Sequence, residues 1–341
     1  MEVEKFPDTF KKIEKEVIIF SLISVFLYQS VYFFIFFLIP LQLLRNRKGF
    51  LQMMQAAVIV SAITLIACFF RTNRVEIFAL RSGIIFSEVL VVIIMLLGFL
   101  YINYNWQGNP RMLKKLVIVT IGAFFIGIPV LLTYNSTVFQ DFYKSQIAVF
   151  LEGTIRTFGE RSGNETLDIV AILKTVDAET VYNTIKVAIM RSYLFLYFIL
   201  LSASWWLGSM KIIDGKLSNN VSLKTLSIPQ FIVWPLIIAL TTVVLDHRVG
   251  LGFLGYIGWN MLLIIITLYG LRGIGIIQSL FLALNVPRFF RVLIYVSLLL
   301  FLLQPGLNFI VLVAVPGLGV SEIWINYKNI REKKYDNENN S

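Results

Sequence analysis

The stretch from Ser227 to Tyr327 is almost entirely apolar, and its few polar residues fall at segment ends or at isolated internal positions. About 20 apolar residues at a rise of 1.5 Å per residue are enough to cross the hydrocarbon layer of a bilayer. An apolar stretch several times that length therefore predicts a series of membrane-spanning helices.

The composition of the whole chain supports this interpretation. Hydrophobic residues make up 57% of the chain and charged residues only 15%, whereas soluble domains carry about 25% charged residues. A single soluble core cannot bury so much apolar surface. The sequence thus predicts an all-α fold, a polytopic transmembrane helical bundle whose principal partner is the lipid bilayer.

Apolar runs between charged clusters predict about eight to nine spans. The first run, Val17 to Leu44, is uncharged and contains Pro40. It is either one long tilted helix or a helix followed by a re-entrant turn around Pro40, and it is too short for two full crossings. The other expected spans are 50–70, 82–104, 116–134, 187–210, 228–245, 251–271 with a continuation to 285, 289–303 and 307–325.

Composition also divides the chain into four parts. Residues 1–134 form an N-terminal membrane bundle of about four spans, and 187–327 a C-terminal bundle of about five. Between them, 135–186 is polar, but apolar residues return there at helical spacing. This pattern predicts amphipathic helices that lie on the membrane or cap the bundle. Residues 328–341 are a charged tail.

The distribution of Lys and Arg in the short loops predicts the orientation, because cytoplasmic loops carry an excess of these residues. With the polar segment outside, the C-terminus is cytoplasmic and the protein lies in a bacterial inner membrane. A re-entrant first segment would add the N-terminal lysines to the cytoplasmic face, so the side of the N-terminus stays open. The bases on the expected cytoplasmic face are Arg45, Arg47, Lys48, Arg111, Lys114, Lys115, Lys211, Lys216, Lys224, Arg288, Arg291, Lys328, Arg331, Lys333 and Lys334.

Several classes of function lack support. The net charge of +10 arises from short clusters between spans, as an orientation signal does, so no nucleic-acid partner is expected. Cys68 and His247 are the only residues of their types, which argues against a zinc site. The chain contains no metalloprotease, redox or nucleotide-binding P-loop motif. We expect no enzyme, no cofactor and no metal; a lipid-modifying enzyme would need polar groups that converge from at least two spans.

The run Gly250 to Gly255 matches the dinucleotide-binding pattern by its letters. That fingerprint requires a strand before it and a helix after it, whereas here it opens a membrane helix. The spacing of Gly252, Gly255 and Gly258 instead predicts helix packing, because small residues let a second helix approach closely.

Polar residues at membrane depth are the candidate solute-lining residues: Glu88, Asn260, Arg272 and Gln278. A charge at the bilayer centre costs at least about 2.5–3.5 kcal/mol, so it persists only when it is paired or solvated. Two interpretations stay open. These residues line a solute or ion pathway, or Glu88 pairs with a nearby arginine and Arg272 reaches the membrane surface with its long side chain.

Six segments of the chain carry a family likeness: Ser227–Trp234, Gly258-Trp-Asn260-Met-Leu-Leu-Ile-Ile, Tyr269-Gly-Leu-Arg-Gly273-Ile-Gly, Val286-Pro287-Arg-Phe-Phe and Gly319–Trp324, with Pro40-Leu41 before a basic turn and Gly49. They resemble the YybS-like family of uncharacterised bacterial membrane proteins. Arg272 and Glu322 depart from that family, which more often has a Gln-like residue and an Asp there.

The family is in turn distantly similar to the substrate-binding subunits of energy-coupling-factor transporters. The resemblance therefore implies a solute-binding or transport-related protein with a small-molecule solute. Those subunits use alanines on their first helix for docking, and the first span here has none. The alternative is a non-catalytic membrane scaffold that contacts other membrane proteins or a second copy of itself.

Overall fold

The computed structural model describes residues 14–30, 32–104, 112–160, 175–208, 211–213, 216–218, 226 and 228–325. Most of these residues lie in helices, which confirms the all-α class. Two short strands, β1 (Lys211–Ile213) and β2 (Lys216–Ser218), pair with each other in the basic loop. The tail expected at 328–341 lies outside the described residues.

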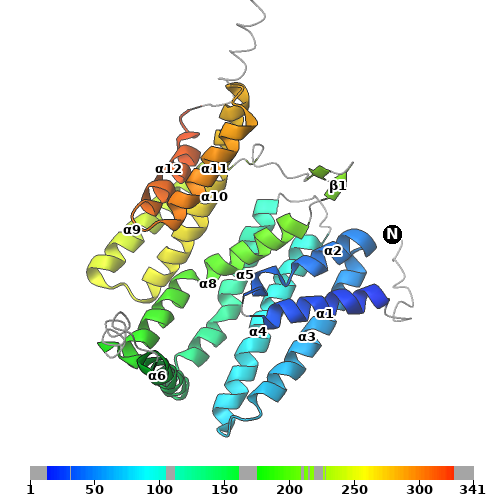
Figure 1. The fold of residues 1–341 in the computed structure, drawn as a ribbon, viewed down its shortest axis with the longest axis vertical. Helices are drawn as coiled ribbons and strands as arrows, with labels where there is room; N and C mark the ends of the chain where they lie inside the picture. The colour runs from blue at the N-terminus through cyan, green and yellow to red at the C-terminus, as the bar shows by residue number, and fades with distance from the viewer. Residues whose placement is uncertain are drawn as a thin grey trace, which may run out of the picture. The chain divides into compact units, whose positions relative to one another are not determined.

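The chain separates into two compact units, Met1–Lys211 and Ile212–Ser341. The separation falls later than the expected start of the C-terminal bundle at 187, because the long helix that begins after Asp177 packs within the first unit. The helices of the first unit are α1 (Lys15–Gln29), η1 (Phe34–Phe36), α2 (Ile39–Lys48), α3 (Phe50–Thr72), α4 (Phe78–Asn103), α5 (Met112–Tyr134), α6 (Thr137–Glu160) and α8 (Ala178–Gly208) (Figure 1).

The first apolar run folds as two short helices, and the break falls before Pro40. Helix α1 ends at Gln29, where Ser30 adopts an extended backbone. Helix α2 begins at Ile39 and holds Pro40 in its first turn, where proline is tolerated because that N–H has no partner in the helix. The hydroxyl of Ser24 donates to the carbonyl of Phe37 and ties the two arms together.

The outer ends of this helical hairpin lie close together. The Lys48 ammonium at the end of α2 is 3.0 Å from the Glu14 carboxylate and 3.4 Å from that of Glu16, at the start of α1. The run 17–44 is therefore a hairpin of two helices instead of one long helix, and it packs against α3.

Helices α3, α4, α5 and α8 form the body of the first unit, and α6 packs against α5 and α8. Helix α6 lies in the polar segment 135–186, where the sequence predicts two amphipathic helices, and the second of these falls largely on 161–174, outside the described residues. Phe139 fixes it to the bundle, because its ring lies where a side chain at Gly83 of α4 would be. Figure 1 shows α6 beside the start of α8.

The second unit is organised around the long helix α10 (Phe253–Ala283), which packs against α9 and α12. Glycines make the contact with α12 close: a Cβ at Gly273 would overlap the Val315 carbonyl, and one at Gly319 would overlap the Tyr269 carbonyl. The other helices of this unit are η3 (Gln230–Ile232), α9 (Val233–Val249), α11 (Arg288–Leu303) and α12 (Asn308–Ser321).

Among the described residues, six helices are long and apolar enough to cross a membrane, so the expected eight to nine spans are not confirmed. The difference arises from short helices: α1, α11 and α12 have 15, 16 and 14 residues, fewer than the roughly 20 that a crossing needs. The six candidate spans are Phe50–Thr72, Phe78–Asn103, Leu113–Thr133, Ala178–Gly208, Gln230–Val249 and Phe253–Ala283.

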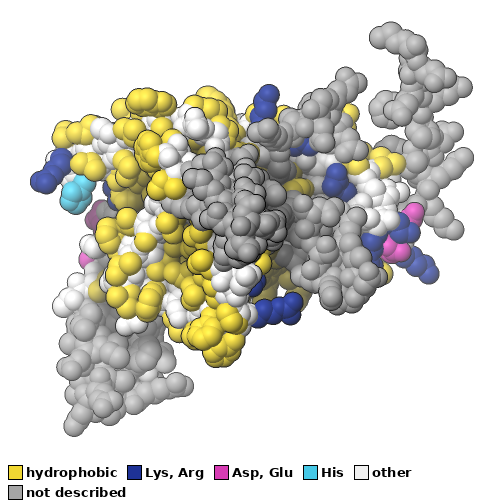
Figure 2. Space-filling model, turned by 90° about the horizontal axis from the view of Figure 1, so that it is seen from above, with side chains coloured by type: hydrophobic (Ala, Val, Ile, Leu, Met, Phe, Trp, Pro, Cys, Tyr) yellow, Lys and Arg dark blue, Asp and Glu magenta, His cyan; other side chains and the backbone are white. Residues whose placement is uncertain are grey.

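Large apolar side chains are exposed on both units. Phe26, Trp234 and Phe289 are 71%, 67% and 72% exposed, and Figure 2 shows hydrophobic side chains over much of the described part of one face. Soluble monomers rarely expose contiguous apolar patches larger than a few hundred Å². These surfaces are suited to contact with lipid.

The glycine contacts of α10 and α12 give a stability prediction. Alanine at Gly273 or Gly319 should destabilise the second unit by about 1–3 kcal/mol, because backbone carbonyls cannot move aside as a flexible side chain can. Thermal unfolding of the purified protein measures the effect. Gly317 is the matched control on α12, since nothing lies within 4 Å of a Cβ there. Equal stability of all three variants would contradict the assignment.

Candidate functional site

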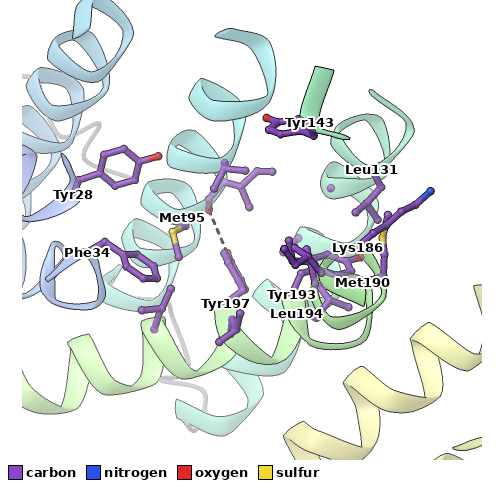
Figure 3. Close-up of a pocket in the computed structure, with 18 of the residues that line it drawn as sticks. Tyr28, Phe34, Met95, Leu131, Tyr143, Lys186, Met190, Tyr193, Leu194 and Tyr197 are labelled. Carbon is purple, nitrogen blue, oxygen red and sulfur yellow. Dashed lines mark hydrogen bonds between the residues drawn. The ribbon is translucent and has the colours of Figure 1, made fainter. Parts of the chain in front are cut away.

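The first unit contains a cavity of about 680 Å³, within the range of about 300–1,000 Å³ that is typical of small-molecule sites. Its lining comes from α1, η1, α4, α5, α6 and α8 and is nearly all apolar (Figure 3). The lining residues are Tyr28, Phe34, Val91, Ile94, Met95, Ala123, Gly127, Leu131, Tyr143, Ile147, Tyr182, Ile185, Lys186, Ile189, Met190, Tyr193, Leu194, Leu196, Tyr197 and Leu200.

Helix α8 supplies the longest wall of the cavity. Its lining residues recur every three or four positions from Tyr182 to Leu200, so they share one face of the helix. At 1.5 Å per residue, this face extends for about 27 Å. The cavity is therefore flanked by an apolar wall about as long as the hydrocarbon layer is thick.

Two close contacts hold α4 against α8 on the side of the cavity nearer to Leu200. The hydroxyl of Tyr197 donates to the Ile94 carbonyl at 3.2 Å, and a Cβ at Gly98 would overlap that same hydroxyl. Tyr197 therefore has a structural partner, and Gly98 leaves the space that its ring needs.

Charge is confined to the end of the cavity near the start of α8. The Lys144 and Lys186 ammonium groups lie 5.8 and 6.0 Å from the centre of the Tyr182 ring. Lys144, which does not line the cavity, is 2.8 Å from the Glu179 carboxylate, and the hydrogen bond that it donates to Glu179 raises the pKa of Lys144. Lys186 lines the cavity and has no carboxylate partner among the described residues.

A second polar group lies deeper. The hydroxyl of Tyr193 is buried and has no hydrogen-bond partner among the described residues, and its residue lines the cavity. An unsatisfied buried hydroxyl costs about 1–3 kcal/mol. A ligand oxygen in the cavity would supply the missing partner.

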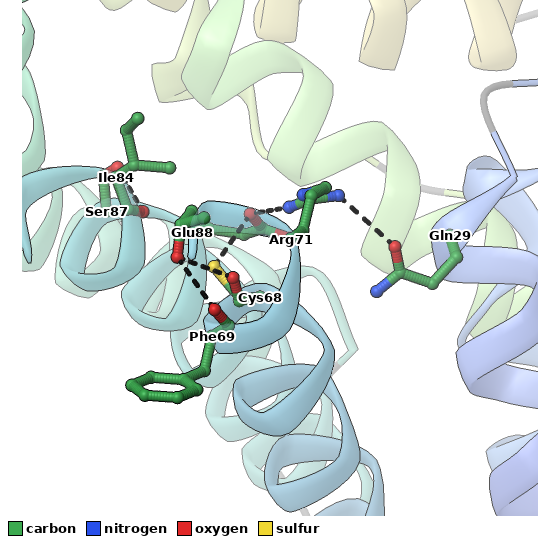
Figure 4. A network of polar contacts seen from close by, with 8 residues as sticks. Gln29, Cys68, Phe69, Arg71, Ile84, Ser87 and Glu88 are labelled. Carbon is green, nitrogen blue, oxygen red and sulfur yellow. Dashed lines mark hydrogen bonds and ion pairs between the residues drawn. The ribbon is translucent and has the colours of Figure 1, made fainter. Parts of the chain in front are cut away.

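The predicted site residue Glu88 lies outside this lining, in a polar cluster that joins three helices (Figure 4). The Arg71 guanidinium donates to the Glu88 carboxylate, and the Cys68 thiol donates to the same oxygen at 3.2 Å. Arg71 also donates to the Gln29 amide oxygen at 3.5 Å. This arrangement is the arginine pairing that the sequence offered as the alternative to a solute pathway.

Arg272 is also paired. Both ends of its guanidinium donate to the Glu322 carboxylate, which follows directly after α12. The side chains of Arg272 and Glu322 are 5% and 25% exposed. The bidentate geometry is the strong form of this interaction, and it fastens α12 to α10.

The other two candidates make local contacts in the second unit. The buried Asn260 amide donates to the Tyr256 carbonyl at 2.8 Å, one turn earlier in α10. A side-chain hydrogen bond joins Gln278 to Tyr295 of α11. Neither residue lines the cavity of the first unit, and a role in a solute pathway stays a prediction for all four.

The three glycines predicted to pack against a second helix, Gly252, Gly255 and Gly258, have different environments. A Cβ at Gly255 would overlap the Asp246 carboxylate and one at Gly258 would overlap the Thr242 side chain, so α9 packs closely on both. Gly252 instead precedes α10 with a positive φ of 56° and has open space around it. The Asp246 carboxylate also accepts the Leu251 N–H at 3.1 Å and so fixes the turn.

The sequence analysis missed the cavity. Its lining residues are ordinary apolar residues of several helices, which no local pattern brings together. One signal was present: Tyr182, Lys186, Tyr193 and Tyr197 repeat at spacings of four and seven, which places them on one face of a helix.

Comparisons with known protein families, with curated proteins and with solved structures find no match. Among the described residues, no group of three or more His, Cys, Asp and Glu side chains could hold a metal ion.

The buried ion pair gives a second prediction. Replacing Glu322 with Gln leaves the Arg272 guanidinium buried without a counter-charge, which should destabilise the second unit by about 3 kcal/mol. Thermal unfolding of the purified variant measures this loss. The double variant Arg272→Met with Glu322→Leu should be closer to the wild type, because no buried charge remains. A Glu322→Gln protein as stable as the wild type would refute a structural role for the pair.

Proposed function

We propose that this chain is a multi-pass protein of the bacterial cytoplasmic membrane that binds an apolar solute between α4, α5, α6 and α8. The observation that carries the proposal is the cavity of about 680 Å³, nearly all apolar, with a buried Tyr193 hydroxyl that no described residue hydrogen-bonds. A transport-related role, as the resemblance to the YybS-like family implies, is consistent with such a site. No catalytic step is proposed.

The scaffold alternative has less support. It predicts a filled bundle with small-residue grooves left free for partners, whereas the first unit has a cavity. Two of the glycines predicted to pack against a second helix, Gly255 and Gly258, already contact α9 of the same chain.

The re-entrant hairpin supports an orientation with both termini in the cytoplasm. Because α1 begins beside Lys48, Lys15 lies on the same side as the basic cluster that ends α2. Six crossings return the chain to that side, and the bias of Lys and Arg assigns it to the cytoplasm.

Labelling of cysteines on intact cells tests this orientation. In a Cys68→Ser background, a membrane-impermeant maleimide should label Asn164→Cys and leave Glu2→Cys and Asn340→Cys unlabelled until the cells are lysed. Serine at position 68 keeps a donor for Glu88. Labelling of either terminal cysteine before lysis would overturn the proposed orientation.

Filling the cavity tests the binding function. A Cβ at Gly127 would lie in ordinary contact with the Tyr193 ring, at 3.5 Å, so the side chain of Gly127→Leu would project into the cavity. We expect this variant to lose binding of long-chain alkyl ligands. A ligand at 100 times its Kd stabilises the folded protein by about 2.7 kcal/mol, which thermal shift detects.

Gly122→Leu is the matched control for this experiment. It lies on the same helix, has open space around its Cβ and does not line the cavity, so its binding should match the wild type. Absence of any shift in the wild type with alkyl ligands, or equal binding by the two variants, would count against the proposed site.

A further inference from the structure

We infer that the ligand of this cavity is a single-chain anionic amphiphile, whose head group binds Lys186 and whose chain fills the apolar interior. This inference rests on the proposed function and adds the chemical class of the ligand. It is carried by the position of Lys186, which no described carboxylate neutralises, at one end of an otherwise apolar cavity.

The polarity of the lining is one-sided. Of the described residues that line the cavity, Lys186 alone carries a charge. It stands two turns from the start of α8, and from there to Leu200 the lining on this helix is apolar apart from Tyr193 and Tyr197. A ligand that matches this pattern has one charged end and one long apolar end.

Lys144 shows by contrast why the Lys186 charge is free to bind a ligand. Both ammonium groups approach the Tyr182 ring at nearly the same distance, 5.8 and 6.0 Å. Glu179 neutralises Lys144, while no described carboxylate does the same for Lys186. A cation that borders a low-dielectric cavity without a counter-charge favours an anion there.

Tyr193 supplies a second polar contact below the head group. It follows Lys186 by seven residues, so it lies on the same face of α8 and about 10 Å deeper. Its buried hydroxyl has no described partner. An oxygen of the ligand beyond its charged end would accept a hydrogen bond from this hydroxyl.

The shape of the cavity agrees with one chain. Its wall on α8 is about 27 Å long at 1.5 Å per residue, and its volume is about 680 Å³. A wall of this length suits an extended alkyl chain better than a compact ring system.

Binding of two probes that share the same alkyl chain and differ in the charge of the head group tests the inference. The full chain in nanodiscs of phosphatidylcholine is titrated with hexadecyl phosphate and with hexadecanol, and displacement of a fluorescent alkyl probe reports binding. We expect the phosphate to bind about tenfold more tightly or better, the ratio expected of one charge-assisted contact. Lys186→Gln should abolish this preference and leave hexadecanol binding unchanged, and Lys186→Arg should retain it.

Lys144→Gln is the matched control, because it removes a cation from the same tyrosine ring but not from the cavity. It should keep the preference for the phosphate. If both glutamine variants lose the preference equally, the attraction comes from general surface charge and the assignment to Lys186 is wrong.

Different outcomes contradict the head-group inference and the proposed apolar site. If hexadecanol and hexadecyl phosphate bind the wild type equally well, the head-group inference is overturned while the proposed apolar site stands. If neither probe binds, the proposed function itself is overturned.

Discussion

The hydrocarbon layer offers no hydrogen bonds, so every polar group that enters it must find a partner within the protein. This constraint explains the strongest contacts of both units. Arg272 and Glu322 neutralise each other beside α10, and Glu88 gathers donors from Arg71 and Cys68. The serine and threonine hydroxyls of the spans mostly donate to carbonyls one turn earlier, as Ser61 does to Ala57.

Because of the same constraint, a buried polar group without a described partner is a candidate contact for a ligand. Of the buried polar atoms without one among the described residues, the Tyr193 hydroxyl is the one whose residue lines the cavity. Nearby, Tyr197 is satisfied by Ile94 and holds α4 close to α8. Along α8, Tyr197 thus holds two helices together, whereas the hydroxyl of Tyr193 has no partner among the described residues.

Much of the membrane architecture could be predicted from the sequence, because charged clusters bound the long apolar runs. The expected spans 50–70 and 82–104 correspond to α3 and α4 to within a few residues. The structure of the first apolar run, 17–44, was harder to predict. Only the polar pair Gln29 and Ser30 marks the break after α1, and the presence of Pro40 drew attention to a later position, although proline in the first turn starts a helix instead of ending one.

The candidate site was less predictable for a different physical reason. Polar residues at depth, such as Arg272, stand out in an apolar sequence, but their prominence reflects the cost of burying them and the need for a partner. A cavity for an apolar ligand has no such signature, because its lining residues are of the same types as those that face lipid. Only packing reveals it, here where side chains of α4, α5, α6 and α8 surround one cavity.

In the proposed orientation, the start of α8 lies on the side away from the cytoplasm, and Lys186 with it. The cavity then has its charged end in the outer half of the membrane and its close contact at Gly98 and Tyr197 further in. A solute with a charged head would enter from the outer half, since the head keeps its hydration there while the chain moves into the protein. Passage toward the cytoplasm would require α4 and α8 to separate at Gly98. Binding alone would leave that contact closed, whereas transport would have to open it.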